Sequence, residues 1–388
     1  MEDIAYVGAE TMPTELRKEA SVTFSQPELN KILAQHERYA MQRGGSRALM
    51  KYARLDGLNL ANRNLKEAEF SGASFVKANL FGSNLTRASL YCADLRRCDL
   101  RNTNLNGADL RGASLNGANL SYATLDHADL RSAVMMKMGP DGFCIIDRSD
   151  SAMGGRGFGT VGVDFSNCSV RHASFGNAQL DGANFSGALL EGANFKGAKL
   201  INATFRGAVL TGVNLKDLAV APEALEGCVL DVSSQAQAKL PSLKEKLDVH
   251  QEWISSGGRR GAAAVLDGED LRPLQKLFAG CQLTGLSARH TIAIGIDFSH
   301  CQLQGAKFDG ADLREADFSQ AELSGASLRA AKLAHAKFNG SVLKRLKLLS
   351  GQFVLPDLSG TETIEGQFVG AILDETIASL GTLSAIRD

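Results

Sequence analysis

The sequence predicts an all-β solenoid, and a period of five residues is the main reason. Between Leu110 and Leu130 every fifth residue is Leu, and an Ala stands two positions before each of them. A helix repeats its apolar residues every 3.6 positions and a half-buried strand every 2, so neither explains this period. A strand that turns a corner every five residues does explain it. Ala and Leu then face the interior together, and the polar residues that follow form the bend.

The second observation is how far the pattern extends. We count 41 repeats in three blocks, whose central residues run Leu55–Met135, Phe165–Leu215 and Phe298–Leu358. Leu or Phe fills every centre except Met135 and Val170. Each coil is expected to bond its backbone to the next coil, about 4.8 Å along the axis. Stacked coils of this kind make a solenoid.

The segments "ADLRG", "ANLSY", "ADLRE" and "ANFKG" resemble the pentapeptide repeat family, whose motif is A-(D/N)-L-x-x. The resemblance implies a right-handed quadrilateral β-helix with four repeats per coil. In the second block Phe recurs every ten residues from Phe165 to Phe205, and Leu or Val fills the centres between. With four sides per coil, that alternation stacks Phe on two opposite sides and aliphatic residues on the other two.

Two similar helices are expected, each ahead of a solenoid segment. Residues 25–45 contain Ser25 and Glu28 at capping-box spacing, and a pair of glycines follows. Residues 240–258 repeat the pattern. The matching positions are Leu29, Leu33, His36 and Tyr39 in the first helix and Leu243, Leu247, His250 and Trp253 in the second. We predict that each helix covers an open solenoid end, with Tyr39 and Trp253 packed inward and both histidines in structural roles.

The predicted organisation is a flexible tail (1–24), a first segment with its helix (25–231) and a second with its helix and a C-terminal tail (232–388). Residues 136–160 interrupt the first segment, but the repeat resumes in frame, so we interpret them as a loop that leaves one continuous solenoid. The segment "SARHTIAIG" (287–295) breaks the pattern and is expected to be a loop. The relative orientation of the segments and the oligomeric state are left open.

Catalytic and metal-binding chemistry finds little support. Four of the seven cysteines take the place of Ala in repeats and are expected to be core fillers: Cys98, Cys168, Cys281 and Cys301. There is no C-x-x-C pair for zinc or redox chemistry. Four histidines occupy outward positions and no two are twenty residues apart, so no stacked ladder is expected: His127, His172, His300 and His335. The glycine-rich 154–159 precedes another repeat rather than a helix, which is weak for phosphate binding. We expect no enzyme activity, cofactor or small-molecule substrate.

The candidate partner-binding surface combines outward arginines with aromatic residues of the first block and two arginines of the interruption. Arg111 and Arg131 are expected to stack below Tyr91 at intervals of twenty residues. Arginine beside aromatic residues is typical of protein contacts. The full set is Phe81, Tyr91, Arg96, Arg97, Arg111, Arg131, Arg148 and Arg156.

The favoured function is a non-catalytic scaffold or regulator that binds a protein partner. One alternative follows from the resemblance, because quinolone-resistance members of the family bind DNA gyrase as DNA mimics. The other is a membrane or nucleic-acid adaptor that uses the basic residues of 341–349. A net charge of −1 and the lack of an apolar run near 20 residues disfavour nucleic-acid and membrane partners. The N-terminus has no signal-peptide profile, so a cytoplasmic location is expected.

Overall fold

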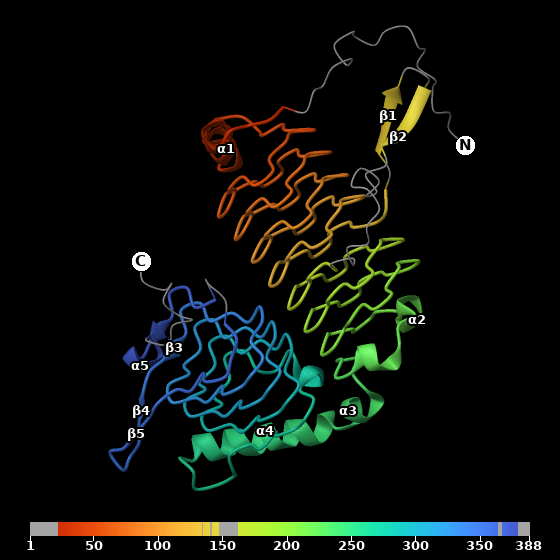
Figure 1. Cartoon of the computed structure of the whole chain (residues 1–388). Helices are drawn as coiled ribbons and strands as arrows, with labels where there is room; N and C mark the ends of the chain where they lie inside the picture. Colours follow the sequence, from red (N-terminus) through yellow and green to blue (C-terminus); the bar gives the residue numbers. More distant parts are fainter. Residues whose placement is uncertain (1–21, 134, 140–141, 147–161, 364–366, 379–388) are drawn as a thin grey trace, which may run out of the picture. The chain divides into compact units, whose positions relative to one another are not determined.

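The computed structural model describes residues 22–133, 135–139, 142–146, 162–363 and 367–378. The chain divides into two compact units, Met1–Val229 and Leu230–Asp388 (Figure 1). Each unit contains a β-helix solenoid. Parallel bridges join a residue to the one twenty positions later, as in Asn79↔Asp99 and Gln302↔Glu322. Four five-residue segments therefore complete one coil. The handedness implied by the family stays a prediction.

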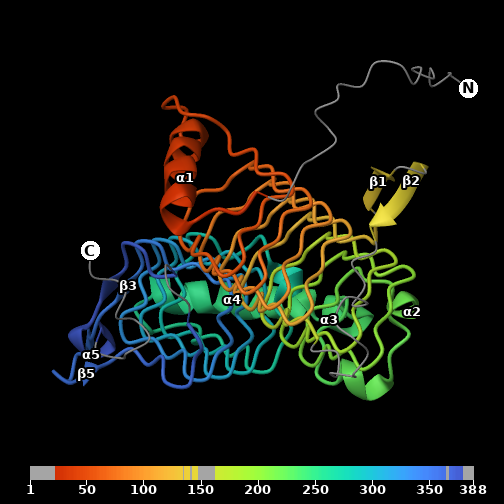
Figure 2. The ribbon, with the colours of Figure 1, turned by 45° about the horizontal axis from the view of Figure 1, so that its top comes forward.

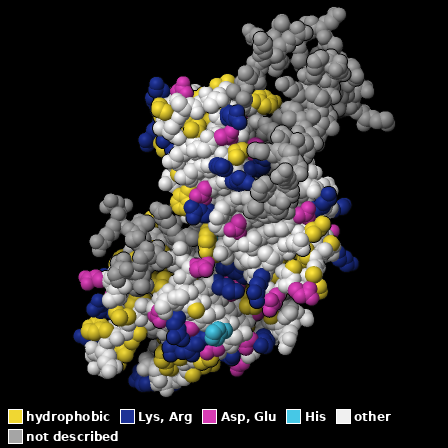
Figure 3. Space-filling view, in the orientation of Figure 1, with side chains coloured by type: hydrophobic (Ala, Val, Ile, Leu, Met, Phe, Trp, Pro, Cys, Tyr) yellow, Lys and Arg dark blue, Asp and Glu magenta, His cyan; other side chains and the backbone are white. Residues whose placement is uncertain are grey.

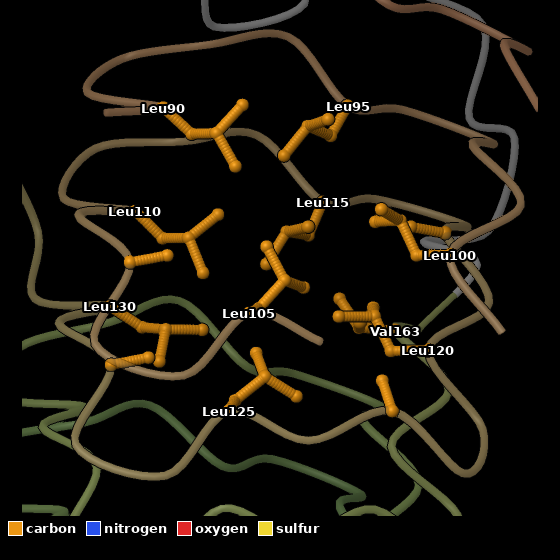
Figure 4. Packing of buried hydrophobic residues seen from close by; sticks show 14 of the residues in the cluster. Leu90, Leu95, Leu100, Leu105, Leu110, Leu115, Leu120, Leu125, Leu130 and Val163 are labelled. Carbon is orange, nitrogen blue, oxygen red and sulfur yellow. The ribbon is translucent and has the colours of Figure 1, made fainter. Parts of the chain in front are cut away.

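The core consists of columns of repeat centres. Figure 4 shows Leu90, Leu110 and Leu130 one above another on one side of unit 1, and all three are buried. In the second block the rings of Phe165 and Phe185 stack with centroids 4.8 Å apart, and those of Phe175 and Phe195 with centroids 4.7 Å apart. The two columns meet edge to face, so the predicted alternation of Phe sides is confirmed.

Each corner is made by a residue in the left-handed backbone region. It stands two positions after the centre, as Gly57 does with φ +68° and Arg97 with φ +56°. This conformation explains the frequent Gly and Asn at that position. Because the side chain of a corner residue points outward, larger residues such as Arg97 are accommodated there at a small conformational cost.

The register of unit 1 continues across the interruption. Asn119 pairs with Asp164 and Thr124 with Ser169, so the partner lies 45 residues on instead of 20. The extra chain contains an antiparallel hairpin of β1 (Met135–Gly139) and β2 (Gly142–Ile146). Met135 was expected as a repeat centre, but it is the first residue of a hairpin strand.

The first solenoid ends in short helices. Leu215 was expected as the last centre of its block, but it begins α2 (Leu215–Leu218) and is exposed. A 3-10 turn, η2 (Pro222–Leu225), follows. Val229 still pairs with Val209, which completes a final irregular coil.

Unit 2 opens with α3 (Ser234–Ala238) and α4 (Leu240–Ser255), and η3 (Arg272–Leu274) interrupts its first coil. The prediction of a loop at 287–295 is wrong. Ser287 pairs with Lys307 and Ile292 with Asp312, so the coil runs through this segment. Side-chain sizes are exchanged there, because Ala288 fills a centre and Leu286 fills the position that Ala usually holds. The interior volume is kept while the sequence pattern is lost.

The end of unit 2 also departs from the predicted repeats. Leu348 and Phe353 were expected as buried centres, but both are exposed. They belong to an antiparallel hairpin of β4 (Leu346–Lys347) and β5 (Phe353–Val354). Ser327 pairs with Asp357, thirty residues on, so ten extra residues leave the coil and the frame is kept. The remaining elements are β3 (Val342–Leu343), β6 (Ile372–Leu373) and α5 (Glu375–Ala378).

Helix α1 (Gln26–Ala40) packs Leu29 and Leu33 into the core of unit 1, and Figures 1 and 2 both place it beside the first coils. Its predicted capping box is present, with the Ser25 N–H donating to Glu28 Oε2 at 2.8 Å. The inward packing predicted for Tyr39 is wrong, since its side chain is exposed. In α4, Trp253 is half-buried, and a Cβ on Gly258 or Gly285 would contact its indole.

Four backbone N–H groups along the first coil bond to chain segments around α1. Arg54 donates to the Val22 carbonyl at 2.9 Å and Glu69 to the Ala48 carbonyl at 2.9 Å. Asn59 and Asn64 donate to side chains of the helix, namely Gln26 Oε1 at 2.8 Å and Glu37 Oε1 at 3.4 Å. Later coils bond these groups to the coil before them. Here α1 supplies two of the four acceptors, and the chain on either side of the helix supplies the other two.

Candidate functional site

One side of unit 1 differs from the other three. Before the interruption its centres are Leu55, Phe75, Leu95 and Leu115, and we call it the excursion side. After Arg131 and Ser132 the chain should form the next segment of this side, but it departs into the β1–β2 hairpin and rejoins on the following side at Asp164. The hairpin therefore emerges from the excursion side, directly beyond Leu115.

Most of the predicted site residues lie at the two corners that border this side. Tyr91, Arg111 and Arg131 form a column at the corner before it, one coil apart. Arg96 and Arg97 occupy the corner after it. Phe81 lies two segments, or half a coil, from Tyr91, so the structure does not bring it to this surface. The Arg101 guanidinium lies over the Phe81 ring at 5.5 Å, at that separate corner.

Three of the four arginines at the two corners are paired with aspartates that the sequence analysis did not single out. Arg96 bonds Asp94 through Nε at 2.9 Å and Nη2 at 2.8 Å. The same two-point contact joins Arg111 to Asp109 and Arg131 to Asp129. The signal was present in the recurring "DLR", since Asp and Arg two positions apart on a strand point to the same face. In each pair the positive charge of the arginine and the negative charge of the aspartate are held together and compensate each other.

Arg111 contacts other residues besides Asp109. Its guanidinium lies over the Tyr91 ring at 5.4 Å and also approaches Asp129 at 3.7 Å. The hydrogen bonds that Arg111 donates to Asp109 raise the pKa of Arg111 further above its ordinary value. Partial burial favours protonation of Asp129, but the hydrogen bonds from Arg131 outweigh it and the pKa of that carboxyl is lowered. Arg111, Asp129 and Arg131 therefore keep their charge near neutral pH.

Arg97 differs from its neighbours. It is exposed, as is Lys77 one coil earlier on the same corner. Among the described residues no carboxylate lies within ion-pair distance of either side chain. Arg148 and Arg156, the two predicted site residues of the interruption, lie outside the described residues.

The expectation that no histidines stack is wrong. The rings of His127 and His172 have centroids 5.2 Å apart and an interplanar angle of 16°. They are 45 residues apart in sequence, which equals one coil plus the interruption, so they occupy the same corner position of successive coils. Both side chains are exposed. Within the ranges that the structure describes, no cluster of three or more His, Cys, Asp or Glu is arranged to hold a metal ion.

Cys98, Cys168 and Cys301 are buried core residues, as predicted. Their thiols donate to carbonyls of neighbouring coils, as Cys301 does to Phe278 O at 2.8 Å. Burial raises the pKa of Cys301 to about 12, so this thiol is unreactive at neutral pH. Cys281 is only half-buried.

The comparisons with known proteins agree with this architecture. The family model for pentapeptide repeats matches the chain in eight copies, and the matched ranges are 53–91, 93–131, 161–197, 188–218, 281–320, 306–345 and 321–354. No curated protein matches the chain. None of the helices in the described part is long and apolar enough to cross a membrane.

Several solved structures are similar. A pentapeptide repeat protein of the Arabidopsis thaliana thylakoid lumen is 24% identical over 34% of this chain and 65% of its own, with a TM-score of 0.20. QnrB1, a plasmid-mediated fluoroquinolone resistance protein, is 21% identical over 50% of this chain and 87% of its own, with a TM-score of 0.25. A pentapeptide repeat protein of the cyanobacterium Cyanothece 51142 is 22% identical over 45% and 93%, with a TM-score of 0.23.

The family model covers more than half of the chain, and the matched segments form coils of four five-residue segments. The chain belongs to the pentapeptide repeat family.

Proposed function

We propose that this protein is a non-catalytic scaffold that binds a protein partner through the excursion side of unit 1. One observation carries the proposal. The β1–β2 hairpin leaves the solenoid on the side that is bordered by both the Tyr91–Arg111–Arg131 column and the Arg96–Arg97 corner. A projecting segment beside rigid, regularly spaced side chains is a common form of binding surface.

The chemistry of the two corners favours a protein over a polyanion. Tyr and Arg are enriched at the centres of protein interfaces, and here Arg111 is already held by Asp109 and the Tyr91 ring. Little side-chain entropy is therefore lost on binding. A nucleic acid would need a strongly basic surface, whereas three of these arginines are neutralised by aspartates.

We further propose that α1 and α4 protect the starts of their solenoids. The support is strongest for α1, whose Gln26 and Glu37 accept backbone N–H groups of the first coil. In unit 2, Gln251 Nε2 donates to the Gln282 carbonyl at 2.7 Å and His250 accepts from Ala264 N–H at 3.1 Å. An open strand edge would otherwise pair with other chains. The six described cysteines are free, which suits the proposed cytoplasmic location.

Deletion of the interruption tests the scaffold proposal. Joining Met135 directly to Val161 removes 25 residues and keeps the frame. We expect the melting temperature to change by about a few degrees, because the other three sides keep their register across the gap. Partners captured from the native lysate by the full chain should be lost. Recovery of the same partners by the folded deletion variant would show that the hairpin is not part of the binding surface.

A further inference from the structure

The β4–β5 hairpin of unit 2 exposes a cluster of large apolar side chains. Leu349, near its turn, is fully exposed, and Phe353 is 57% exposed. Three more large apolar residues of the hairpin are also exposed: Leu348, Val354 and Leu355. Figure 3 shows hydrophobic and basic side chains together at the lower left, where Figure 1 places β4 and β5. A concentration of this kind on a protruding segment calls for a partner.

The hairpin is an ordered element that holds these side chains away from the solenoid. The Leu348 N–H donates to the Gln352 carbonyl at 2.8 Å, and the Gly351 N–H donates back to the Leu348 carbonyl at 2.9 Å. At its base, Leu346 lies over Gly325, where a Cβ would come within 2.7 Å of Leu346 Cβ. The glycine leaves room for the hairpin to dock, so the geometry of the tip is fixed by the fold.

The charged residues of the hairpin segment itself are all basic. Residues 341–356 contain three basic and no acidic side chains. The charge of Arg345 is compensated, because its Nε lies 2.8 Å from Asp374 Oδ2. Lys344 and Lys347 are exposed, and within the described part of the chain neither has a carboxylate at ion-pair distance. Two uncompensated ammonium groups thus lie beside the apolar cluster.

We propose that this hairpin inserts its apolar tip into the surface of a membrane that carries anionic headgroups. The tip is convex, and a bilayer interface accepts an apolar protrusion without a matching cavity. Lysines beside it would remain at headgroup level, where anionic lipids attract them. Lysine is depleted from protein interfaces, so this composition favours lipid over a protein partner. The proposal concerns peripheral attachment by unit 2 and does not depend on the surface proposed on unit 1.

Vesicle co-sedimentation of the full chain tests the proposal. The probes are vesicles of phosphatidylcholine mixed with phosphatidylserine, and vesicles of phosphatidylcholine alone. We expect binding to the mixed vesicles, a loss of about tenfold or more for Leu349→Asp, and a smaller loss for Lys344→Glu with Lys347→Glu. The matched control is Ile201→Asp, because Ile201 is 66% exposed in unit 1 and should not affect binding. Melting curves establish that each variant is folded.

Three results would overturn the proposal. The first is absence of binding to either vesicle, and the second is equal binding by folded Leu349→Asp. The third is a dimer in sedimentation velocity that Leu349→Asp dissociates while vesicle binding is absent, which would assign the hairpin to a second copy of the chain. Equal binding to both vesicle types would show that anionic headgroups are not required, and would overturn that part of the proposal.

Discussion

The imidazole of His36 accepts a hydrogen bond at Nδ1 from the backbone N–H of Ala48 at 3.1 Å. His250 and Ala264 repeat this contact at the same distance in unit 2. Both histidines are fully buried, and Nε2 has no hydrogen-bond partner among the described atoms. In each unit one histidine therefore joins the long helix to the strand that begins the first coil. The contact requires an unprotonated Nδ1.

Both units should lose stability in mild acid. Burial lowers the pKa of His36 and of His250. At His36 the backbone of Leu65 and Lys66 and the charge of Glu37 raise the pKa, and Arg47 lowers it, but burial prevails. The unfolded chain, with a histidine pKa of about 6.5, then binds more protons than the folded chain as pH falls through that value. This contribution is present above about pH 6.5 and is lost as pH falls toward the folded-state pKa. Urea melts between neutral pH and about pH 5, where most carboxylates remain ionised, should show the loss.

The control for this prediction replaces the two imidazoles by a side chain that accepts but does not titrate. His36→Asn with His250→Asn should flatten the pH dependence. The stability at neutral pH measures the packing that is lost with the two rings. His127→Asn, at an exposed position, should leave the pH dependence unchanged. If the double variant keeps the full dependence on pH, the histidine contacts do not cause it.

Inward and outward positions should differ sharply in tolerance. Leu120 is fully buried, and Leu120→Asp places a charge without a partner in the core. We expect a loss above about 4 kcal/mol, seen as unfolding or a large drop in melting temperature. Asn116→Asp, at a corner, should change stability by less than about 0.5 kcal/mol. Equal effects at the two positions would contradict the assigned interior.

The period of five was sufficient to predict the solenoid, because each repeat carries its own core residue and its own corner. What it could not reveal is any insertion whose length is a multiple of five. Leu348 and Phe353 keep the phase of the repeat, yet they lie on a hairpin that replaces two repeats. His127 and His172 stack although they are 45 residues apart, because 25 of those residues are an insertion and the remaining twenty are one coil. Phase alone does not identify which residues meet.

A second error was to predict a loop where the chain forms a regular coil. The total volume of the buried side chains is kept in that coil, but the usual residue types are not. Leu286 and Ala288 exchange the usual large and small positions, so a coil was mistaken for a loop. The predicted stacking of Tyr91, Arg111 and Arg131 at one corner is confirmed. The pairing of these arginines with aspartates was not predicted. A count of positive and negative residues along the chain does not reveal which of them face the same side of a strand.

The stacked phenylalanines should contribute strongly to the stability of unit 1. Phe185 contacts Phe165 at 4.8 Å and Phe205 at 5.0 Å between ring centroids. Phe185→Ala would remove both contacts and leave a cavity, with an expected loss of about 3–5 kcal/mol. Phe185→Leu fills most of the space and should cost less. Chemical denaturation of the two variants checks this, and equal losses would argue against ring packing as the source.

We expect no effect on DNA gyrase. A DNA mimic needs strongly acidic faces, whereas the aspartates at the corners of the excursion side are neutralised by Arg96, Arg111 and Arg131. The purified protein should neither inhibit supercoiling nor protect gyrase from a quinolone. Inhibition at stoichiometric amounts would favour the gyrase interpretation over the general scaffold.

Charge reversal at the corner column provides the sharpest test of the proposed partner surface. Arg111→Glu with Arg131→Glu should weaken partner capture most at low salt, because exposed charges are screened beyond about 10 Å at 0.1 M salt. The reversal also breaks the pairs with Asp109 and Asp129, so some stability is lost as well. Arg206→Glu is the matched control, since Arg206 pairs with Glu226 in the same unit on a different corner. Capture by this control should match the unaltered chain at every salt concentration. A defect in the double variant that is independent of salt, or one shared by the control, would trace the effect to stability and not to a binding surface at this column.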